Sequence, residues 1–242
     1  MLELNKIYCM DCLEGMKQIP DGTIDCCVTS PPYNKGEKKN SGKLVSAVVY
    51  ENYKDDMTED EYQCQQIEVL NELARILKRD GSVFYNHKNR YINGNLISPL
   101  SWICKSDLVV RQEIVWNRII AANLRGWRFW NTDERIYWLQ RKDAHPKELN
   151  MNYAKWGSVW TIPVETKKQD HPCPFPPAIP ELCIGSTCER DSVVIDPYMG
   201  SGTVAVSAIK HKCKFIGFEI SQEYVDIANK RIAAETSQLS LF

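Results

Sequence analysis

Residues 192–205 read SVVIDPYMGSGTVA, and this stretch decides the fold. The apolar run at its start predicts a buried strand, and Gly200 and Gly202 predict a tight turn that leads into a helix. A second strand and a second helix are expected next, at Phe215–Glu219 and from Ser221 to about Ala234. Strand–helix–strand alternation of this kind is typical of a mostly parallel sheet with helices on both faces.

The N-terminal half shows the same alternation. Strands are predicted at Asn5–Cys9, Thr23–Thr29 and Ser82–Asn86, and helices at Cys12–Ile19 and after Thr58, which fits a capping box with Glu61. Two more strands, Leu108–Trp116 and Arg135–Leu139, are expected with an Arg- and Trp-rich connection between them. Residues 144–170 are expected to be irregular, and a short helix is predicted at Ala178–Ile184. The sequence therefore predicts a doubly wound α/β fold.

Composition and charge exclude several classes of protein. The 242 residues are 43% hydrophobic and 25% charged, a balance that argues against disorder. No apolar run is long enough for a membrane span, and the first residues lack the layout of a signal peptide, so we expect a cytoplasmic protein. The net charge is −1, but Lys105 to Lys142 carries eight basic residues against four acidic ones, which predicts a local cationic face.

Ten cysteines raise the question of disulfides or a metal. Without a secretion signal a disulfide framework is not expected. Cys9 and Cys12 form a Cys-x-x-Cys pair, but no second pair follows at a spacing suited to zinc. We therefore expect reduced, mostly buried thiols and no metal site.

The loop after the second strand carries the chemistry. It reads Ser-Pro-Pro-Tyr at residues 30–33. Two prolines stiffen the backbone and remove two N–H donors, so the loop presents carbonyl acceptors, the Ser30 hydroxyl and the Tyr33 ring. Such a cup suits a planar heterocycle that bears an amino group. Asp11, Asp196 and Glu219 fall at other predicted strand ends, where ligands of parallel sheets bind.

The glycine turn predicts a nucleotide site. Residues 200–205 satisfy Gly-x-Gly-x-x-Ala, and Glu219 lies where a ribose-binding acid is expected. By itself the pattern does not separate a dinucleotide from S-adenosylmethionine.

Taken together, these residues resemble the DNA amino-methyltransferases of bacteria and phages, which methylate N4 of cytosine or N6 of adenine. Four blocks carry the resemblance: residues 10–14, 29–34, 171–176, and 196–203 with 217–219. Their order, with the catalytic loop first, is similar to that of the permuted β class. The resemblance implies a seven-stranded Rossmann-like methyltransferase fold in circularly permuted order and one domain over residues 1–242. It also implies a mobile basic loop at about 35–56 and a short target-recognition segment at about 117–170.

The resemblance also implies roles for residues. S-adenosylmethionine would be the methyl donor, and S-adenosylhomocysteine the product. The residues that would bind this cofactor are Asp11, Cys12, His171, Phe175, Asp196, Tyr198, Gly200, Ser201, Gly202, Thr203 and Glu219. Catalysis would fall to Ser30, Pro31, Pro32 and Tyr33. Ser30 Oγ and the Pro31 carbonyl would accept hydrogen bonds from the amine of a flipped base, with Tyr33 stacked on that base. Candidates for contact with double-stranded DNA are Lys35, Lys38, Lys39, Arg118, Arg125, Trp127 and Arg128.

The target and partners stay open at this level. Ser30 at the first motif position favours N4 of cytosine, with N6 of adenine as the alternative. Cys173 does not match the cysteine nucleophile that C5 methylation requires. A glutamine or RNA methyltransferase would place the glycine loop first, and an NAD-dependent oxidoreductase would leave residues 30–33 unexplained. An inactive DNA-binding subunit is the remaining alternative, and the partners left open are a second copy in a homodimer and a cognate restriction endonuclease.

Overall fold

The computed structural model describes residues 2–34, 57–122, 126–164 and 176–239. The strands are β1 (Lys6–Cys9), β2 (Ile24–Thr29), β3 (Leu77–His87), β4 (Arg90–Ile92), β5 (Asn95–Ile97), β6 (Leu108–Ala122), β7 (Asn131–Arg141), β8 (Val159–Thr161), β9 (Val193–Asp196) and β10 (Lys214–Glu219). The helices are α1 (Cys12–Met16), α2 (Glu59–Ile76), α3 (Leu100–Ile103), α4 (Met151–Ala154), α5 (Ala178–Thr187), α6 (Thr203–Lys210) and α7 (Gln222–Leu239).

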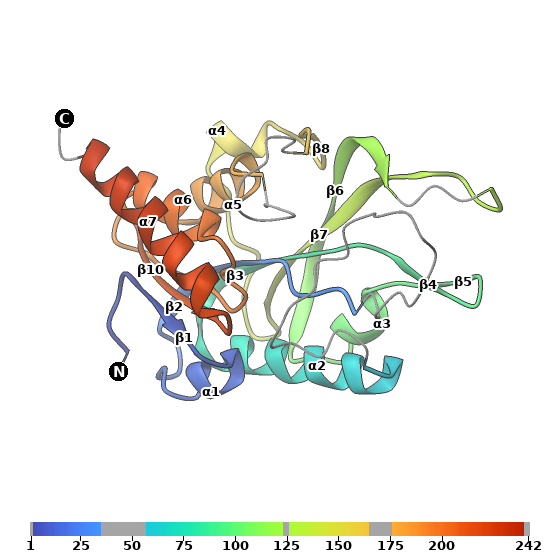
Figure 1. Ribbon diagram of the computed structural model, residues 1–242, viewed down its shortest axis with the longest axis horizontal. Helices are drawn as coiled ribbons and strands as arrows, with labels where there is room; N and C mark the ends of the chain where they lie inside the picture. The colour runs from blue at the N-terminus through green and yellow to red at the C-terminus, as the bar shows by residue number, and fades with distance from the viewer. Residues whose placement is uncertain (1, 35–56, 123–125, 165–175, 240–242) are drawn as a thin grey trace.

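One large sheet runs through the molecule (Figure 1). Its strand order is β1-β10-β9-β2-β3-β7-β6-β8. The strands from β1 to β3 pair in parallel, β7 is antiparallel to both of its neighbours, and β8 pairs in parallel with β6. The doubly wound, mostly parallel fold is confirmed. The sheet has one strand more than the expected seven, because the three-residue β8 adds to the edge of β6 within a segment expected to be irregular.

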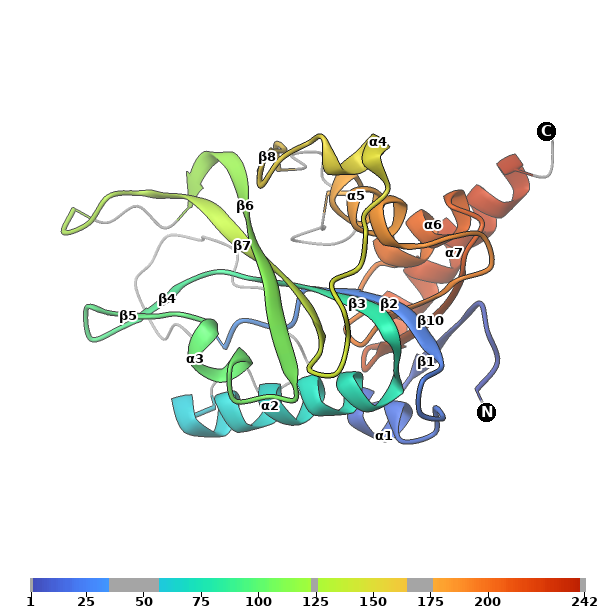
Figure 2. The same cartoon turned by 180° about the vertical axis from the view of Figure 1, so that it is seen from behind.

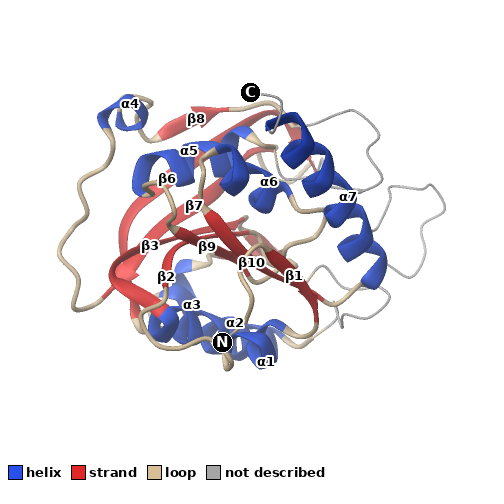
Figure 3. Ribbon diagram, turned by 90° about the vertical axis from the view of Figure 1, so that its left-hand side faces the viewer, coloured by secondary structure: helices blue, strands red, loops and turns tan. Residues whose placement is uncertain are grey.

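Helices cover both faces of the sheet, with α5, α6 and α7 on one side and α1, α2 and α3 on the other (Figure 3). Each layer has its own core. Ile179, Val204 and Ala228 join the core under the first three helices, and Leu70 and Trp102 join the core under the others. Central strands contribute to both cores. Their near-continuous apolar sequence is what a parallel sheet buried on both faces requires.

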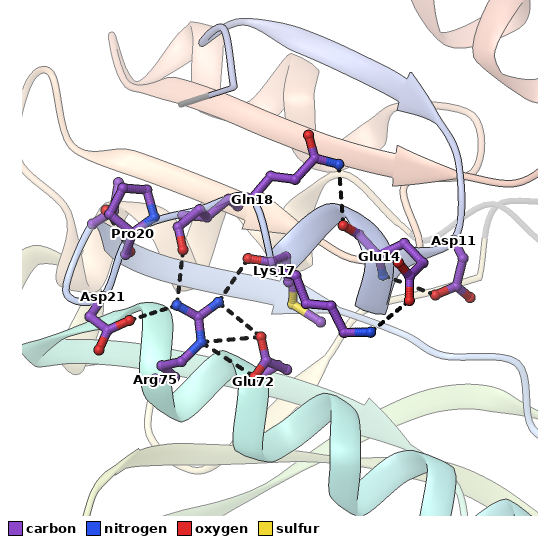
Figure 4. A network of polar contacts seen from close by, with 11 residues as sticks. Asp11, Glu14, Lys17, Gln18, Pro20, Asp21, Glu72 and Arg75 are labelled. Carbon is purple, nitrogen blue, oxygen red and sulfur yellow. Dashed lines mark hydrogen bonds and ion pairs between the residues drawn. The ribbon is translucent and has the colours of Figure 1, made fainter.

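The segment around α2 shows how local sequence sets these elements. Thr58 and Glu61 form the predicted capping box, which satisfies the free N–H groups at the start of α2. Near the end of α2, Arg75 donates hydrogen bonds to the carbonyls of Met16 and Ile19 and forms an ion pair with Asp21 (Figure 4). Arg75 therefore fastens the end of α1 and the turn that leads into β2, the strand that carries the Ser-Pro-Pro-Tyr loop.

Two further features depart from the sequence prediction. The predicted connection between β6 and β7 is mostly strand, since β6 continues to Ala122 and β7 begins at Asn131. A small antiparallel hairpin, β4–β5, was not predicted at all. Both hairpins extend away from the helical layers on the same side of the molecule (Figures 1 and 2).

The chain order of the strands brings its two ends to one side. Helix α7 packs against β1 and β10. The N- and C-terminal segments lie on the same side of the molecule, as the permuted order requires (Figures 1 and 2). Within the described residues, no helix is both long and apolar enough to cross a membrane.

Candidate active site

Four neighbouring parallel strands deliver the predicted site residues to one edge of the sheet. Strands β2, β9 and β10 end at Thr29, Asp196 and Glu219, and β1 ends two residues before Asp11. Because these strands are parallel neighbours, their carboxyl ends meet at the same edge. The predicted positions of Asp11, Ser30, Asp196 and Glu219 at strand ends are therefore confirmed.

A buried hydrogen bond joins the two loops that the sequence singled out. Thr29, the last residue before the Ser-Pro-Pro-Tyr loop, donates from Oγ1 to Oδ1 of Asp196 at 2.8 Å. The same carboxylate oxygen accepts from the backbone N–H of Tyr198, at the start of the glycine turn. Burial raises the pKa of Asp196 to about 7, against the lowering effect of these two hydrogen bonds. A cation bound beside this carboxyl would stabilise its ionised form.

The glycine turn is held by backbone geometry that only glycine accepts without strain. Gly202 has φ 83°, and a Cβ built on it would lie 2.8 Å from Cβ of Ala228 on α7. Gly217 of β10 lies against the same loop, since a Cβ built on it would clash with the side chain of Met199. The turn therefore packs directly against α7 and β10, and α6 starts immediately behind it.

Glu219 ties the turn to the end of β10. Its Oε2 accepts from the backbone N–H of Gly200 and its Oε1 from that of Ser221, both at 2.9 Å. Burial raises the pKa of this carboxyl, and the backbone hydrogen bonds lower it in part. Each carboxylate oxygen keeps a second lone pair, so a ribose diol can still donate to it.

The hydroxyls of Ser201 and Thr203 have a partner that the sequence did not reveal. Arg231 of α7 donates from Nη1 to Oγ of Ser201 at 2.8 Å and to Oγ1 of Thr203 at 3.2 Å. These two residues are buried, so we expect their predicted contact with a cofactor to come from backbone N–H groups rather than from the hydroxyls. Arg231 carried no signal in the sequence, because α7 meets the turn only through the fold.

Asp11 and Cys12 line the same edge from β1. Asp11 caps α1 by accepting from the backbone N–H groups of Leu13 and Glu14. Burial raises the pKa of the Cys12 thiol to about 12, and a hydrogen bond with Tyr198 lowers it in part. Cys12 is therefore a neutral thiol that packs beside Tyr198. Among the described residues, no group of three or more His, Cys, Asp or Glu side chains could hold a metal ion.

The Ser-Pro-Pro-Tyr loop is braced from α2 and β3. The Tyr62 hydroxyl donates to the carbonyl of Pro32 at 2.7 Å and lies 2.8 Å from Nε2 of His87. Burial lowers the pKa of His87 to about 3, so this ring is neutral at pH 7. One of the two proline carbonyls is thus already used. The sequence suggested the catalytic role for the other carbonyl, that of Pro31.

A polar network closes over the loop. The Tyr33 hydroxyl lies 2.9 Å from Oγ of Ser30 and donates to Oε2 of Glu134 at 3.0 Å. Nδ2 of Asn86 reaches Ser30, Tyr33 and Glu134 at 3.3, 2.8 and 3.1 Å. Arg118 donates to the other oxygen of Glu134 at 2.8 Å. Burial, with the charge of Glu134 second, raises the pKa of Tyr33.

Two members of this network, Asn86 and Glu134, were not among the predicted site residues. Asn86 sits near the end of β3, a strand end that the sequence did predict. Glu134 lies near the start of β7 and is 7% exposed, with no motif around it. The Tyr33 ring, expected as an open stacking platform, is half-buried and lies 4.6 Å from the ring of His87, with Lys88 Nζ 5.0 Å from its centroid.

The predicted DNA contacts divide into three groups. Arg118 is part of the polar network, while Trp127 and Arg128 lie on the β6–β7 hairpin with Trp127 exposed. The remaining predicted DNA contacts lie outside the described parts of the chain: Lys35, Lys38, Lys39 and Arg125. Two residues predicted to bind the cofactor, His171 and Phe175, lie outside them as well.

Comparison with known sequences identifies relatives along nearly the whole chain. A family model described as DNA methylase, for N6 and N4 methyltransferases, matches residues 24–230. The type II methyltransferase M.BglII of Bacillus subtilis is 28% identical over 99% of this chain and 72% of its own length. M.HinfI of Haemophilus influenzae, also a type II methyltransferase, is 29% identical over 95% of this chain and 68% of its own length.

Solved structures share the fold. The cytosine-N4-specific PvuII DNA methyltransferase superposes with a TM-score of 0.74, at 20% identity over 96% of this chain and 91% of that one. TTHA0409 of Thermus thermophilus, complexed with S-adenosyl-L-methionine, gives 0.69 at 19% identity over 95% of this chain and 93% of that one. The complex of M1.HpyAVI with the same cofactor gives 0.66 at 22% identity, covering 93% and 98%.

Proposed function

The chain belongs to the N6/N4 DNA methylase family, and on that premise we propose that it methylates N4 of cytosine in double-stranded DNA. The protein is an S-adenosylmethionine-dependent DNA amino-methyltransferase. The choice of cytosine rests on Ser30 at the first position of the catalytic loop. The likeness in fold to a cytosine-N4-specific enzyme is consistent with it. N6 of adenine is the alternative target.

The observation that carries the proposal is the hydrogen bond between Thr29 and Asp196. Thr29 directly precedes Ser30, and Asp196 leads into the glycine turn, so this hydrogen bond holds the catalytic loop beside that turn. The cofactor carries a cationic sulfonium and ammonium and a ribose diol. The buried carboxyl of Asp196 and the half-buried carboxyl of Glu219 suit those groups, and Gly200 and Gly202 allow the backbone to approach closely. When bound, S-adenosylmethionine supplies the activated methyl group.

The residues of the loop prepare the amine. An exocyclic amine on a base is a weak nucleophile because its lone pair is delocalised into the ring. The two N–H groups of the amine would donate hydrogen bonds to Ser30 Oγ and to the Pro31 carbonyl. These hydrogen bonds favour a pyramidal nitrogen and direct its lone pair toward the glycine turn. No covalent intermediate with the protein is needed.

Glu134 sets the direction of the hydrogen bonds in this loop. A carboxylate only accepts hydrogen bonds, so the single proton of the Tyr33 hydroxyl goes to Glu134. The Tyr33 oxygen must then accept the proton of Ser30, 2.9 Å away. Ser30 Oγ accepts from Asn86 at 3.3 Å and is left with a second lone pair that can accept from the substrate amine. We therefore assign Glu134 and Asn86 as positioning residues that fix the direction in which Ser30 acts.

A base within a duplex cannot reach this loop and has to be extruded. We propose that residues 117–170 recognise the target, and that Arg118, Trp127 and Arg128 belong to the DNA-facing side, with the basic residues at 35–39 and Arg125 as further contacts. The type II names of the relatives support a place in a restriction–modification system. Because the substrate is DNA and the curated relatives are bacterial, we place the activity in the bacterial cytoplasm.

Methyl transfer from labelled S-adenosylmethionine to unmethylated plasmid DNA tests the assignment. Wild-type protein should label the DNA, and the Ser30→Ala/Tyr33→Ala double variant should lose at least about a hundredfold in rate, since hydrogen bonds used in a transition state contribute on that scale. Binding of S-adenosylmethionine by calorimetry should be retained in the variant. Undiminished transfer by the double variant would defeat the assigned site, and wild-type protein that binds cofactor and DNA without transfer would favour an inactive DNA-binding subunit.

A further inference from the structure

Large apolar side chains are exposed mainly on the two hairpins. Of the eleven that the described part of the chain leaves exposed, seven lie on β4–β5 or on the β6–β7 hairpin. At the end of the latter, Trp127 and Trp130 are 58% and 59% exposed, and Phe129 is 98% exposed. Clustered exposure of this kind marks an interaction surface rather than the scattered apolar residues of an ordinary surface.

The hairpins brace one another just behind Phe129. The ring of Tyr91 in β4 meets that of Trp127 edge to face at 5.5 Å. The Arg128 guanidinium lies 4.4 Å from the centroid of the Tyr91 ring and donates to the carbonyl of Phe129 at 3.2 Å. These contacts support the backbone at Phe129, and its ring projects into solvent.

A bulge at the base of the same hairpin stores local strain. Four residues of β6, Arg118–Ala121, face the single residue Thr132 of β7. Within this bulge Ile119, a β-branched residue, has φ 69° and is 57% exposed. Bulges re-aim side chains, and strain of this kind collects at functional sites. Here the bulge turns Arg118 toward Glu134 and leaves Ile119 outside.

Charge identifies the partner. The two hairpin segments, residues 88–97 and 117–131, contain five basic residues and no acidic one. Two of the five, Arg90 and Arg118, form ion pairs with Glu59 and Glu134 from outside these segments, which leaves a surplus of three positive charges. A second copy of this chain would bring like charges together at a two-fold contact. A polyanion with an apolar, stacked interior fits both the charge and the aromatic side chains.

The two hairpins also begin at the catalytic loop. Arg118 and Glu134, at the base of β6–β7, reach Tyr33 through the polar network. His87 and Lys88, which precede β4, lie against the Tyr33 ring. Any duplex that these hairpins contact is therefore held beside the residues that receive the extruded base.

We propose that Phe129 is a wedge that enters the base stack of duplex DNA next to the target and occupies the space that the extruded base leaves. Trp127, Arg128 and Tyr91 support the wedge, and Trp130 adds contact area beside it. The inference rests on the proposed function and extends it: it assigns the unpairing of the target to this hairpin, separately from the transfer step at Ser30.

The test compares paired with unpaired targets. The methylated position is first mapped on plasmid DNA, and short duplexes are made in which the target base is either paired or mismatched. Phe129→Ala should slow transfer to the paired duplex about tenfold, within the range expected for loss of one stacking contact. On the mismatched duplex, where unpairing costs less, the loss should be less than about twofold.

Controls separate the possible outcomes. Phe129→Trp should restore transfer to the paired duplex, and Leu4→Ala, which removes an exposed apolar side chain before β1 and outside the proposed DNA-facing segments, should leave both substrates unaffected. Equal losses of Phe129→Ala on both duplexes, or no loss on either, would overturn the wedge while leaving the methyltransferase intact. Sedimentation showing a dimer for wild type and a monomer for Phe129→Ala would also overturn it, in favour of self-association. No transfer by wild-type protein to any DNA would refute the proposed function itself.

Discussion

At the scale of single residues, the proposed role of Ser30 as a hydrogen-bond acceptor depends on the direction of a few hydrogen bonds. Glu134 accepts from Arg118, Asn86 and Tyr33, and all three donors point toward one carboxylate. An amide at this position would present both a donor and an acceptor, and the orientation of the Tyr33 and Ser30 hydroxyls would no longer be fixed.

Glu134→Gln is therefore expected to lower kcat by about tenfold to a hundredfold, the equivalent of one hydrogen bond to a charged group. Affinity for S-adenosylmethionine should not change. Glu113→Gln is the matched control, because Glu113 is an acid of β6 that pairs with Arg135 away from the catalytic loop. In a Ser30→Ala background the Glu134 substitution should cost little more, since its effect runs through Ser30. Additive losses would show that Glu134 acts otherwise.

Asp196 provides a prediction of pH dependence. Its pKa is about 7 in the folded protein, mainly because of burial, against ~3.9 for an unfolded aspartate. Between these values the folded state holds a proton that the unfolded state has lost. The stabilisation is thus complete below pH ~4 and disappears as pH rises through about 7, a difference of at most about 4 kcal/mol.

Urea unfolding of wild type and Asp196→Asn at several pH values measures this effect. Asparagine can accept the hydrogen bonds of Thr29 and Tyr198 without becoming charged. Relative to this variant, wild type should lose stability between pH ~4 and pH ~7, while the other titrating groups cancel in the comparison. A constant difference between the two proteins across this range would contradict the burial argument.

At the scale of elements, turns at strand ends decide where the site forms. Gly202 illustrates two requirements at once, a positive φ and a close approach to Ala228. Gly22 shares the positive φ, but a Cβ there would meet nothing within 4 Å. Comparison of the two positions therefore separates backbone strain from lost space.

We expect Gly22→Ala to lower the free energy of unfolding by about 1 kcal/mol through backbone strain alone. Gly202→Ala should cost about 2–4 kcal/mol, because overpacking against α7 adds to the strain. Gly202→Ala should also weaken cofactor binding, which Gly22→Ala should not. Both quantities follow from urea unfolding and calorimetry, and equal costs at the two glycines would disprove the close contact.

The same scale explains what sequence could predict. Period and turn signals placed Asp11, Ser30, Asp196 and Glu219 at the carboxyl ends of parallel strands, and the fold brings those ends together. Glu134 could not be found in this way. Strand β7 is antiparallel, so it is its beginning that reaches this edge, as the pairing of His87 with Arg135 shows.

At the scale of the whole molecule, the sheet separates two tasks. The strands from β1 to β3 and their helices carry most of the residues predicted to bind the cofactor, and there the sequence motifs are dense and the predicted strand ends are confirmed. The antiparallel β7, the long β6 and the β4–β5 hairpin build the side that we propose faces a base and a duplex. Their sequences follow no short motif, because many of the side chains there are exposed and no buried core requires a regular apolar pattern. The extension of β6 to Ala122, the start of β7 at Asn131 and the β4–β5 hairpin were therefore not predicted, whereas helices α1, α2, α5, α6 and α7 were.

The most direct measurement of the central claim is the identity of the methylated nucleoside. Plasmid DNA treated with the protein and S-adenosylmethionine is digested to nucleosides and analysed by mass spectrometry. We expect N4-methylcytosine in DNA treated with wild-type protein and none in DNA treated with the Ser30→Ala variant. N6-methyladenine would keep the amine chemistry and contradict the choice of base. A product methylated at carbon, such as 5-methylcytosine, would contradict the assignment of the Ser30–Tyr33 loop as an amine-binding site.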